Sequence, residues 1–190
     1  SVTATFSLIN GTNNQFSFSG IEFHGFNNVN STSGLLNTLE GSNQADSFSA
    51  ISGNGLTANG ISFNDIETVN AGSGDDDITH DLPNWVVQAA NTASIESISF
   101  TGIDSINKDN SDGITNRLLT GTTGDDSFGV ADTNVVSSMG ITYYGIGTVA
   151  AGNGSDDVQH TATNWTVQGA NETLIEDIDF TGIDSINKEN

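Results

Sequence analysis

Four turns rich in glycine and aspartate contain the side chains of this sequence that are best suited to chemistry. They span residues 41–48, 71–78, 121–128 and 151–158, and each places an aspartate two residues before an apolar residue. Carboxylate oxygens are ligands that calcium prefers, and glycine permits the tight backbone that gathers such ligands. The sequence therefore predicts calcium sites at these turns, with the following candidate ligands: Asp46, Asp75, Asp76, Asp77, Asp125, Asp126, Asp156 and Asp157.

A second interpretation of the same turns needs no metal. Aspartate in a tight turn accepts hydrogen bonds from nearby backbone N–H groups, so these residues can serve the turns alone. Carboxylates stacked about 4.8 Å apart, the spacing of adjacent strands, repel by about 1 kcal/mol per pair in bulk water. A divalent cation between coils would remove that repulsion. Both interpretations stay open at the level of sequence.

The composition of the chain excludes several classes of partner. The 190 residues include 24 acidic and only 3 basic side chains, for a formal net charge of −21. Nucleic-acid binding requires a basic surface, and so does attraction to an anionic membrane, so neither partner is expected. No apolar run approaches the roughly 18 residues of a membrane span. The absence of cysteine is compatible with an exported protein that is stiffened by hydrogen bonds or bound ions instead of disulfides.

An internal repeat of 80 residues positions the acidic turns. Residues 60–110 recur as 140–190, and Thr101–Lys108 is identical to Thr181–Lys188. A shorter unit lies inside this repeat and begins with isoleucine, any residue and an aromatic. Its successive starts are 40, 37, 43 and 37 residues apart, at these positions: Ile21, Ile61, Ile98, Ile141 and Ile178. The 80-residue repeat is therefore a pair of alternating coils.

Short strands are predicted within each unit, because apolar and polar residues alternate there, as in Ile61-Ser-Phe63. Clusters of Gly, Asn and Asp between them predict turns. A repeat of about 40 residues suits a β-propeller blade or a coil of a β-solenoid. Units of uneven length would not close the ring of a propeller neatly, so the spacing favours the solenoid. We expect an all-β, parallel β-solenoid (β-helix) of about five coils of 37–43 residues. It forms one domain, with coils at approximately 1–38, 39–70, 71–118, 119–150 and 151–190.

Stacked coils place equivalent side chains above one another, and one coil alone could not bury them. We therefore expect three apolar columns in the core. The first contains Phe23, Phe63, Phe100, Tyr143 and Phe180. The second contains Val29, Val69, Ile106, Val149 and Ile186, and the third contains Phe48, Ile78, Phe128 and Val158.

The acidic turns resemble the calcium-binding nonapeptide of RTX proteins, Gly-Gly-x-Gly-x-Asp-x-apolar-x. Residues 71–79 match it except at Ala71, and residues 151–159 depart in the same way. Residues 121–129 lack the second glycine, and residues 41–49 keep only the first glycine, the aspartate and the apolar residue. In RTX proteins the nonapeptides follow one another directly. Here they are interrupted, which predicts fewer protein ligands for each calcium ion.

More widely, residues 15–190 resemble the β-strand repeats of giant bacterial surface adhesins, of the filamentous-haemagglutinin-like and RTX types. The resemblance implies a secreted or cell-surface location and a role in a stalk, a surface layer or a biofilm matrix filament. It does not identify a ligand. The last coil is as regular as an internal one, so we also expect stacking on neighbouring repeats, or copies of the chain stacked end to end.

Other residues allow alternative functions. The main alternative is a module whose exposed ladders bind a carbohydrate or a cell-surface protein. Trp85 and Trp165 could stack on sugars, although their repeat equivalence favours packing in the core or at its rim. His24, His80 and His160 lack close metal-binding partners in sequence, and we expect them on the surface or in turns. The acidic residues recur in register with the repeat, so we expect them to have a structural role. We do not expect the protein to be an enzyme, and this includes a polysaccharide lyase.

Overall fold

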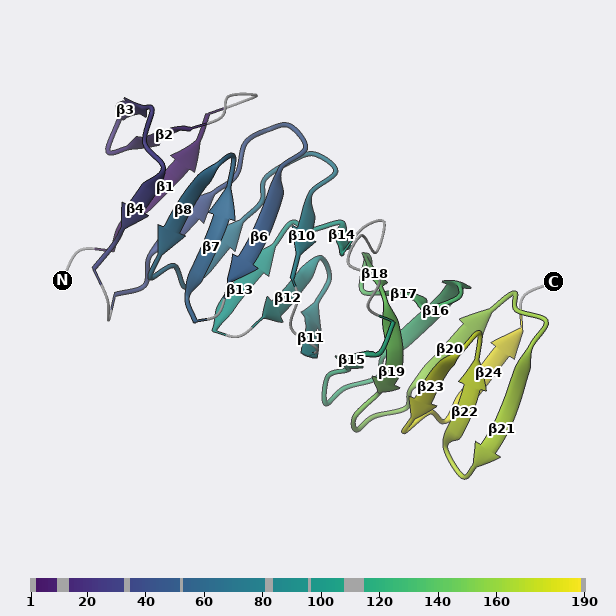
Figure 1. Ribbon diagram of the computed structural model, residues 1–190. Coiled ribbons are helices and arrows are strands. Elements are labelled where there is room, and N and C mark those ends of the chain that lie inside the picture. Colours follow the sequence, from purple (N-terminus) through teal and green to yellow (C-terminus); the bar gives the residue numbers. More distant parts are fainter. Residues whose placement is uncertain are drawn as a thin grey trace. The chain divides into compact units, whose positions relative to one another are not determined.

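The computed structural model describes residues 3–9, 14–32, 35–51, 53–80, 84–95, 97–107 and 115–188. Within these ranges the regular structure consists of short β-strands joined by turns (Figure 1). Strands of successive coils stack in parallel and form a β-solenoid of about five coils, which confirms the predicted fold class. The described residues contain no helix that could cross a membrane.

The chain divides into two compact units. Unit 1 comprises Ser1–His80 and Thr92–Ser105, and unit 2 comprises Asp81–Asn91 and Ile106–Asn190. The short strand β14 (Ser105–Ile106) lies where the chain passes from one unit to the other. Each unit is built from two sheets whose inward-facing side chains are buried.

The described residues of unit 1 form twelve strands, most of which are labelled in Figure 1. They are β1 (Thr5–Leu8), β2 (Gln15–Phe18), β3 (Ile21–His24), β4 (Asn28–Asn30), β5 (Thr38–Glu40), β6 (Ser47–Ile51), β7 (Gly55–Ala58), β8 (Ile61–Asn64), β9 (Thr68–Asn70), β10 (Asp77–Thr79), β12 (Thr92–Ile95) and β13 (Ile98–Thr101). One sheet has the order β12-β13-β9-β5-β1-β2-β3, and the other has the order β10-β6-β7-β8-β4.

Unit 2 repeats this arrangement. Its strands are β11 (Asn84–Ala89), β15 (Arg117–Thr120), β16 (Ser127–Asp132), β17 (Val135–Ser138), β18 (Ile141–Tyr144), β19 (Ile146–Ala150), β20 (Asp157–His160), β21 (Trp165–Gly169), β22 (Glu172–Ile175), β23 (Ile178–Thr181) and β24 (Ser185–Lys188). One sheet has the order β21-β22-β23-β19-β15-β11, and the other has the order β24-β20-β16-β17-β18.

Two kinds of strand pairing alternate along the chain. Strands of different coils pair in parallel, as β5 does with β9 and β16 with β20. Strands joined by a tight turn pair antiparallel, in three-stranded meanders such as β6-β7-β8. The second turn of a meander has two consecutive residues with positive φ, as at Asn59-Gly60 and Met139-Gly140. This is the backbone of a type I′ hairpin, whose twist matches that of the strands. The repeat analysis predicted stacked coils but not these meanders.

The predicted aromatic column is wrong as a continuous stack. Its members from Phe63 to Phe180 are fully buried, but successive members lie in alternate sheets. Three of the rings instead pair in register with a valine of a neighbouring coil: Phe63 with Val29, Phe100 with Val69 and Phe180 with Val149. The reason is that the chain crosses between the two sheets, so consecutive sequence units fall on opposite sides of the core. The second predicted column alternates in the same way.

The third predicted column is confirmed within each unit. Phe48 pairs in register with Ile78, and Phe128 pairs with Val158. All four side chains are fully buried. These residues are the last residue of each acidic turn segment. Their pairing therefore fixes the register in which each turn meets the turn of the neighbouring coil.

Candidate functional site: two ladders of buried aspartates

Each unit contains a row of three aspartates that runs across adjacent coils. We call these rows the aspartate ladders. The ladder of unit 1 is Asp46, Asp76 and Asp104, and the ladder of unit 2 is Asp126, Asp156 and Asp184. Corresponding members lie 80 positions apart in the sequence. The ladders are therefore part of the repeat and are formed independently in each unit.

Side chain to backbone hydrogen bonds connect the ladder of unit 1. The backbone N–H of Asp46 donates to Asp76 Oδ1 at 2.8 Å, and the backbone N–H of Asp76 donates to Asp104 Oδ2 at 2.9 Å. The Asp46 carboxylate turns back on its own turn, where the backbone N–H of Ser42 donates to Oδ2 at 2.6 Å. Each carboxylate thus satisfies a backbone N–H group that belongs to the turn or to the next coil.

The ladder of unit 2 has the same connections. The backbone N–H of Asp126 donates to Asp156 Oδ1 at 2.8 Å, and the backbone N–H of Asp156 donates to Asp184 Oδ2 at 3.1 Å. Within its own turn, Asp126 Oδ2 accepts from the backbone N–H of Thr122 at 2.7 Å and from the Thr122 hydroxyl at 3.0 Å. A threonine in place of Ser42 adds a hydroxyl donor to the carboxylate without changing the pattern.

The glycines of the turns let adjacent turns lie in direct contact. A Cβ atom on Gly72 would lie 2.2 Å from the carbonyl oxygen of Ser42, and one on Gly152 would lie 2.2 Å from that of Thr122. Both glycines have φ near +102°, a conformation that other residues rarely adopt. The glycine pattern that resembles the RTX nonapeptide is therefore required by the stacking of backbone on backbone.

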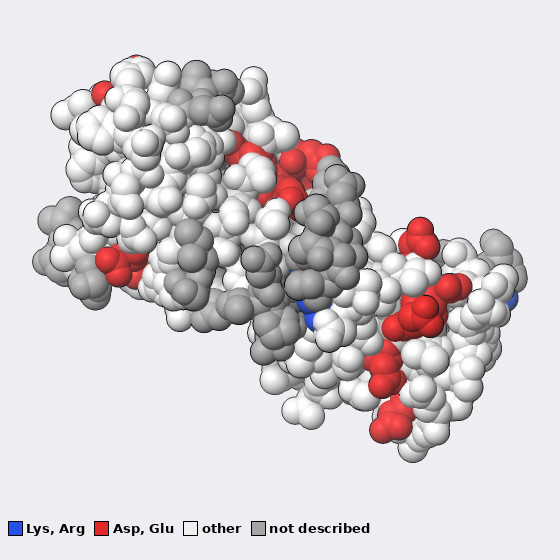
Figure 2. All heavy atoms as spheres, viewed as in Figure 1, with Lys and Arg blue, Asp and Glu red and all other residues white. Residues whose placement is uncertain are grey.

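Burial makes the ladders electrostatically demanding. The side chains of Asp46, Asp76, Asp126 and Asp156 lie almost entirely out of solvent, with at most 5% exposed. Within the described residues, one buried oxygen on each of the last three has no hydrogen-bond partner: Asp76 Oδ2, Asp126 Oδ1 and Asp156 Oδ2. Figure 2 shows other acidic side chains gathered in patches on the visible surface of each unit, with few basic ones.

The middle member of each ladder has a raised pKa. Burial raises the pKa of Asp76 and of Asp156 above the ordinary value, because it disfavours the charged carboxylate. The hydrogen bond from the backbone of the preceding aspartate opposes this shift, and the negative charges of the neighbouring carboxylates add to it. The unpartnered oxygens and the raised pKa both indicate a place where a proton or a cation would reduce the free energy.

The remaining predicted calcium ligands lie outside the ladders. Asp75 and Asp125 are exposed on the turns, and Asp125 Oδ1 accepts from the backbone N–H of Ser155 at 2.8 Å. In the part of the chain that the structure describes, no group of three or more His, Cys, Asp or Glu side chains is arranged to hold a metal ion. The eight predicted residues are thus divided among ladder, turn and strand positions.

Asp77 and Asp157 are the two predicted ligands that lie in strands. They occupy equivalent positions in β10 and β20 and are half-buried. The Ser105 hydroxyl donates to Asp77 Oδ1 at 3.0 Å, and the Ser127 hydroxyl donates to Asp157 Oδ2 at 3.2 Å. These contacts join neighbouring strands and place both carboxylates beside the ladders, not within them.

Asp104 and Asp184 are ladder members that the sequence analysis did not include. They lie in the identical segments 101–108 and 181–188, outside the glycine-rich turns. The signal that identifies them is the repeat itself, since each follows the preceding ladder aspartate by 28 residues. They are less buried than the other members, and Asp184 is exposed.

The expectation that His80 and His160 lie on the surface or in turns is wrong. Each is 2% exposed. His160 pairs in register with Val130 in the stacked strands, so its ring follows the inward-facing positions of β20. The Trp165 ring lies against it, with 5.7 Å between the ring centres. His24 is exposed as expected, and its Nε2 lies 3.6 Å from Glu22 Oε2.

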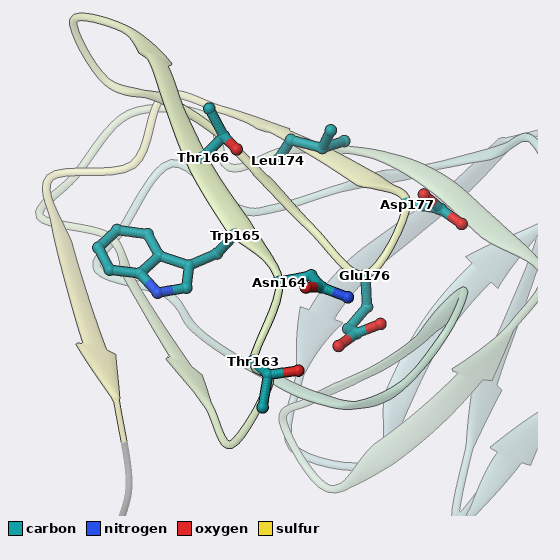
Figure 3. A pocket seen from close by; sticks show the side chains of 7 residues that line it. All are labelled: Thr163, Asn164, Trp165, Thr166, Leu174, Glu176 and Asp177. Atoms are coloured by element: carbon teal, nitrogen blue, oxygen red, sulfur yellow. The ribbon is translucent and has the colours of Figure 1, made fainter.

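Trp165 borders a hollow of about 310 Å³ at the surface of unit 2. In Figure 3 the Trp165 ring extends to one side of β21, and the side chains of Asn164 and Glu176 lie together on the other side. Trp165 is 44% exposed, which places it at the rim of the core. The side chain of its repeat partner Trp85 lies outside the described residues. The hollow is lined by Thr163, Asn164, Trp165, Thr166, Leu174, Glu176 and Asp177.

The resemblance to surface adhesins rests on the turn sequences and the repeat alone. Comparison of the chain with protein-family models, with curated proteins and with solved structures gave no match.

Proposed function

We propose that this chain is a structural repeat module of a secreted or cell-surface protein, in which the aspartate ladders join neighbouring coils. One observation carries the proposal: both ladders recur 80 residues apart with the same hydrogen bonds between carboxylate and backbone. Acidic groups that recur in register and bind the backbone of the next coil serve the stacking of coils. The adhesin-like turns support a location at a bacterial surface or in a biofilm matrix.

Calcium is the counter-ion that we propose for the ladders. The oxygens Asp76 Oδ2, Asp126 Oδ1 and Asp156 Oδ2 are buried and without a hydrogen-bond partner in the described structure. Each can coordinate a cation. Calcium takes six to eight oxygen ligands, so backbone carbonyls and water would complete its shell. A bound ion would offset the cost of burying the charge, which is the main cause of the raised pKa of the middle carboxylate, and also the repulsion from its neighbours. A proton offsets the same repulsion, so the two have to be separated by experiment.

Thermal unfolding with calcium and with excess chelator at pH 7 separates them. We expect chelator to lower the melting temperature of the wild type, since binding to the folded state alone stabilises it. The Asp76→Asn and Asp156→Asn variants retain a carbonyl acceptor but lose the charge, and we expect their calcium response to be smaller. Asp132→Asn, on an exposed residue outside the ladders, is the matched control. A wild-type melting temperature that chelator leaves unchanged would remove calcium from the proposal.

A second candidate function is binding of a carbohydrate or protein at the surface of unit 2. It is favoured by the exposed Trp165 ring, which lines the same hollow as the polar residues Asn164 and Glu176, because ligand sites combine aromatic side chains with a few hydrogen-bonding groups. A glycan array with the wild type and Trp165→Ala tests it. Binding that the substitution abolishes supports this function, and an array without signal opposes it.

A further inference from the structure

The acidic turn of residues 151–158 contains a pair of residues that can react without an enzyme, Asn153-Gly154. An asparagine side chain can be attacked by the backbone nitrogen of the residue that follows it. Glycine favours this reaction, because it has no side chain to shield the nitrogen and its backbone has more freedom than that of other residues. The chain has four Asn-Gly pairs, at residues 10–11, 54–55, 59–60 and 153–154, and the structure describes the last three.

At Asn54 the surroundings of the side chain oppose the reaction. Its side-chain amide donates to Glu67 Oε1 at 3.0 Å. The other oxygen of that carboxylate accepts from the backbone N–H of Asn37 at 2.7 Å, so the acceptor is itself held in place. Gly55 is buried at the start of β7, which pairs with β6. Asn54 therefore has to break contacts before its side chain can approach the Gly55 nitrogen.

At Asn59 the backbone opposes the reaction. Asn59-Gly60 is the two-residue turn between β7 and β8, and both residues have positive φ. The carbonyl oxygen of Asn59 accepts from the backbone N–H of Asn14 at 2.8 Å. Asn14 also lies close to Gly60, where a Cβ atom would be 2.6 Å from Asn14 Oδ1. A type I′ turn between paired strands fixes the asparagine backbone, and closing a five-membered ring onto the next nitrogen requires a different ψ.

Asn153 has neither restraint. Asn153 and Gly154 are exposed, and they lie in a turn between β19 and β20. Within the described residues, the Asn153 side chain and the Gly154 N–H have no hydrogen-bond partner. The first backbone anchor after them is the Ser155 N–H, which donates to Asp125 Oδ1 at 2.8 Å. No contact therefore has to break before the side chain and the nitrogen meet.

We propose that Asn153 is a site of spontaneous deamidation. The Gly154 nitrogen forms a bond to Asn153 Cγ, and the bond from Cγ to Nδ2 breaks. The side-chain nitrogen leaves as ammonia with the proton of the Gly154 N–H, and a five-membered succinimide ring remains. Water then opens the ring at one of its two carbonyl carbons, to which it gives its hydroxyl group, while the ring nitrogen regains a proton. Opening at Cγ gives aspartate, and opening at the backbone carbonyl carbon gives isoaspartate.

The isoaspartate product does not fit the stacked turns. Its main chain passes through the former side chain and is one carbon atom longer. The turn lies in direct contact with the turn of residues 121–128, since a Cβ on Gly152 would lie 2.2 Å from the carbonyl oxygen of Thr122, and one on Gly154 would lie 2.4 Å from that of Gly124. A longer main chain has to displace one of these contacts. We therefore expect isoaspartate, but not aspartate, to disturb the stacking of turns in unit 2.

The repeat supplies a matched comparison. The equivalent turn of unit 1 has Ser73 in the place of Asn153 and Gly74 in the place of Gly154. Gly74 is packed as closely as Gly154, since a Cβ there would lie 2.6 Å from the backbone carbonyl carbon of Gln44. Turn stacking thus does not need asparagine at this position. Asn153→Ser removes the reactive amide and gives unit 2 the residue that unit 1 already has.

Peptide mapping by mass spectrometry tests the proposal on protein kept at physiological temperature and mildly alkaline pH. Each conversion replaces an amide by a carboxyl group, and electron-based fragmentation distinguishes aspartate from isoaspartate. We expect Asn153 to convert at least about tenfold faster than Asn54 and Asn59, because those two sites have to open locally before they react. Equal rates at the three sites, or an Asn153 that stays intact, overturn the proposal.

The melting temperature before and after the same incubation tests the consequence. We expect it to fall in the wild type and to stay unchanged in Asn153→Ser. Fresh Asn153→Asp has the charge of one product on a normal backbone, and we expect it to melt close to the fresh wild type. Isoaspartate without a loss of stability, or an equal loss in Asn153→Ser, overturns the expected effect on stacking. None of these outcomes depends on calcium or on the ladder carboxylates, so the proposed function is tested separately.

Discussion

At the scale of single residues, the ladder carboxylates show how a buried charge can be retained in a fold. A buried ionised group is costly unless it is hydrogen-bonded or paired with an opposite charge. Asp76 accepts one hydrogen bond from the neighbouring coil, yet its second oxygen has no partner among the described residues. The carboxylate therefore stabilises the stack through the backbone and destabilises it through its charge. Experiments that alter these two effects separately are the most informative.

Lowering the pH changes the charge of the ladder carboxylates without a substitution. Between the ordinary pKa of 3.8 and the raised value in the folded protein, the folded state holds a proton on Asp76 and Asp156 that the unfolded chain has released. The contribution of these groups to stability is therefore complete below the ordinary value and is lost as pH rises through the folded value.

In calcium-free buffer we expect their contribution to raise the melting temperature as pH falls from 7 toward 4. The Asp76→Asn/Asp156→Asn double variant removes both groups and should show a smaller rise, measured by circular dichroism. A rise of the same size in the wild type and the double variant would show that other groups cause it.

Tyr143 provides a second test at this scale. It is fully buried, its hydroxyl has no hydrogen-bond partner within the described structure, and burial raises the pKa of that hydroxyl. Phenylalanine occupies the same position in the other four copies of the short sequence repeat, as Phe23, Phe63, Phe100 and Phe180. We expect Tyr143→Phe to stabilise the protein by about 1 kcal/mol, because it removes a buried hydroxyl without a hydrogen-bond partner and keeps a ring of similar shape. Denaturant unfolding measures this, with half-buried Tyr144→Phe as the control. A loss of stability would mean that the Tyr143 hydroxyl has a partner.

At the scale of elements, the glycine turns are fitted to one another. Gly72 lies so close to the Ser42 carbonyl that a side chain has no space, whereas a Cβ on Gly53 would meet nothing within 4 Å. Both glycines have positive φ, +77° at Gly53 and +102° at Gly72, so alanine is strained at both sites. The additional loss at Gly72 reports the close packing of turn on turn.

We therefore expect Gly72→Ala to destabilise the protein by about 1–3 kcal/mol more than Gly53→Ala, the typical cost of overpacking. Gly152→Ala should have the same effect in unit 2, where the neighbour is the Thr122 carbonyl. Equilibrium unfolding of the three variants measures the differences. Equal losses at Gly53 and Gly72 would show that turn stacking contributes little.

Much of the element pattern could be predicted from the sequence, because like residues recur at fixed spacing. The repeat located the acidic turns and the column that contains Phe48 and Ile78, whose members lie in one sheet. It could not show that Phe63 and Phe100 lie in opposite sheets, because period-2 alternation does not report which sheet a strand joins. The third ladder member, Asp104, was missed because it lies outside the glycine-rich turn that drew attention to Asp76.

At the scale of the whole molecule, the duplication itself is informative. Unit 1 and unit 2 each contain a complete ladder with the same donors and acceptors. A substitution at Asp76 and one at Asp156 are therefore two independent trials of one hypothesis within a single chain. Agreement between them would show that the ladder is a property of the repeat and not of one local environment.

The central claim is that the ladder carboxylates hold adjacent coils together, and removing one acceptor tests it most directly. The measurement is the free energy of unfolding in chelator, together with hydrogen exchange at the Asp46 amide, for Asp76→Ala against the exposed-turn control Asp75→Ala. We predict that Asp76→Ala loses about 2 kcal/mol and the protection of that amide, because a buried N–H group is left unpaired. Asp156→Ala should do the same at the Asp126 amide. Asp76→Ala and Asp75→Ala of equal stability, with the Asp46 amide still protected, would contradict the account.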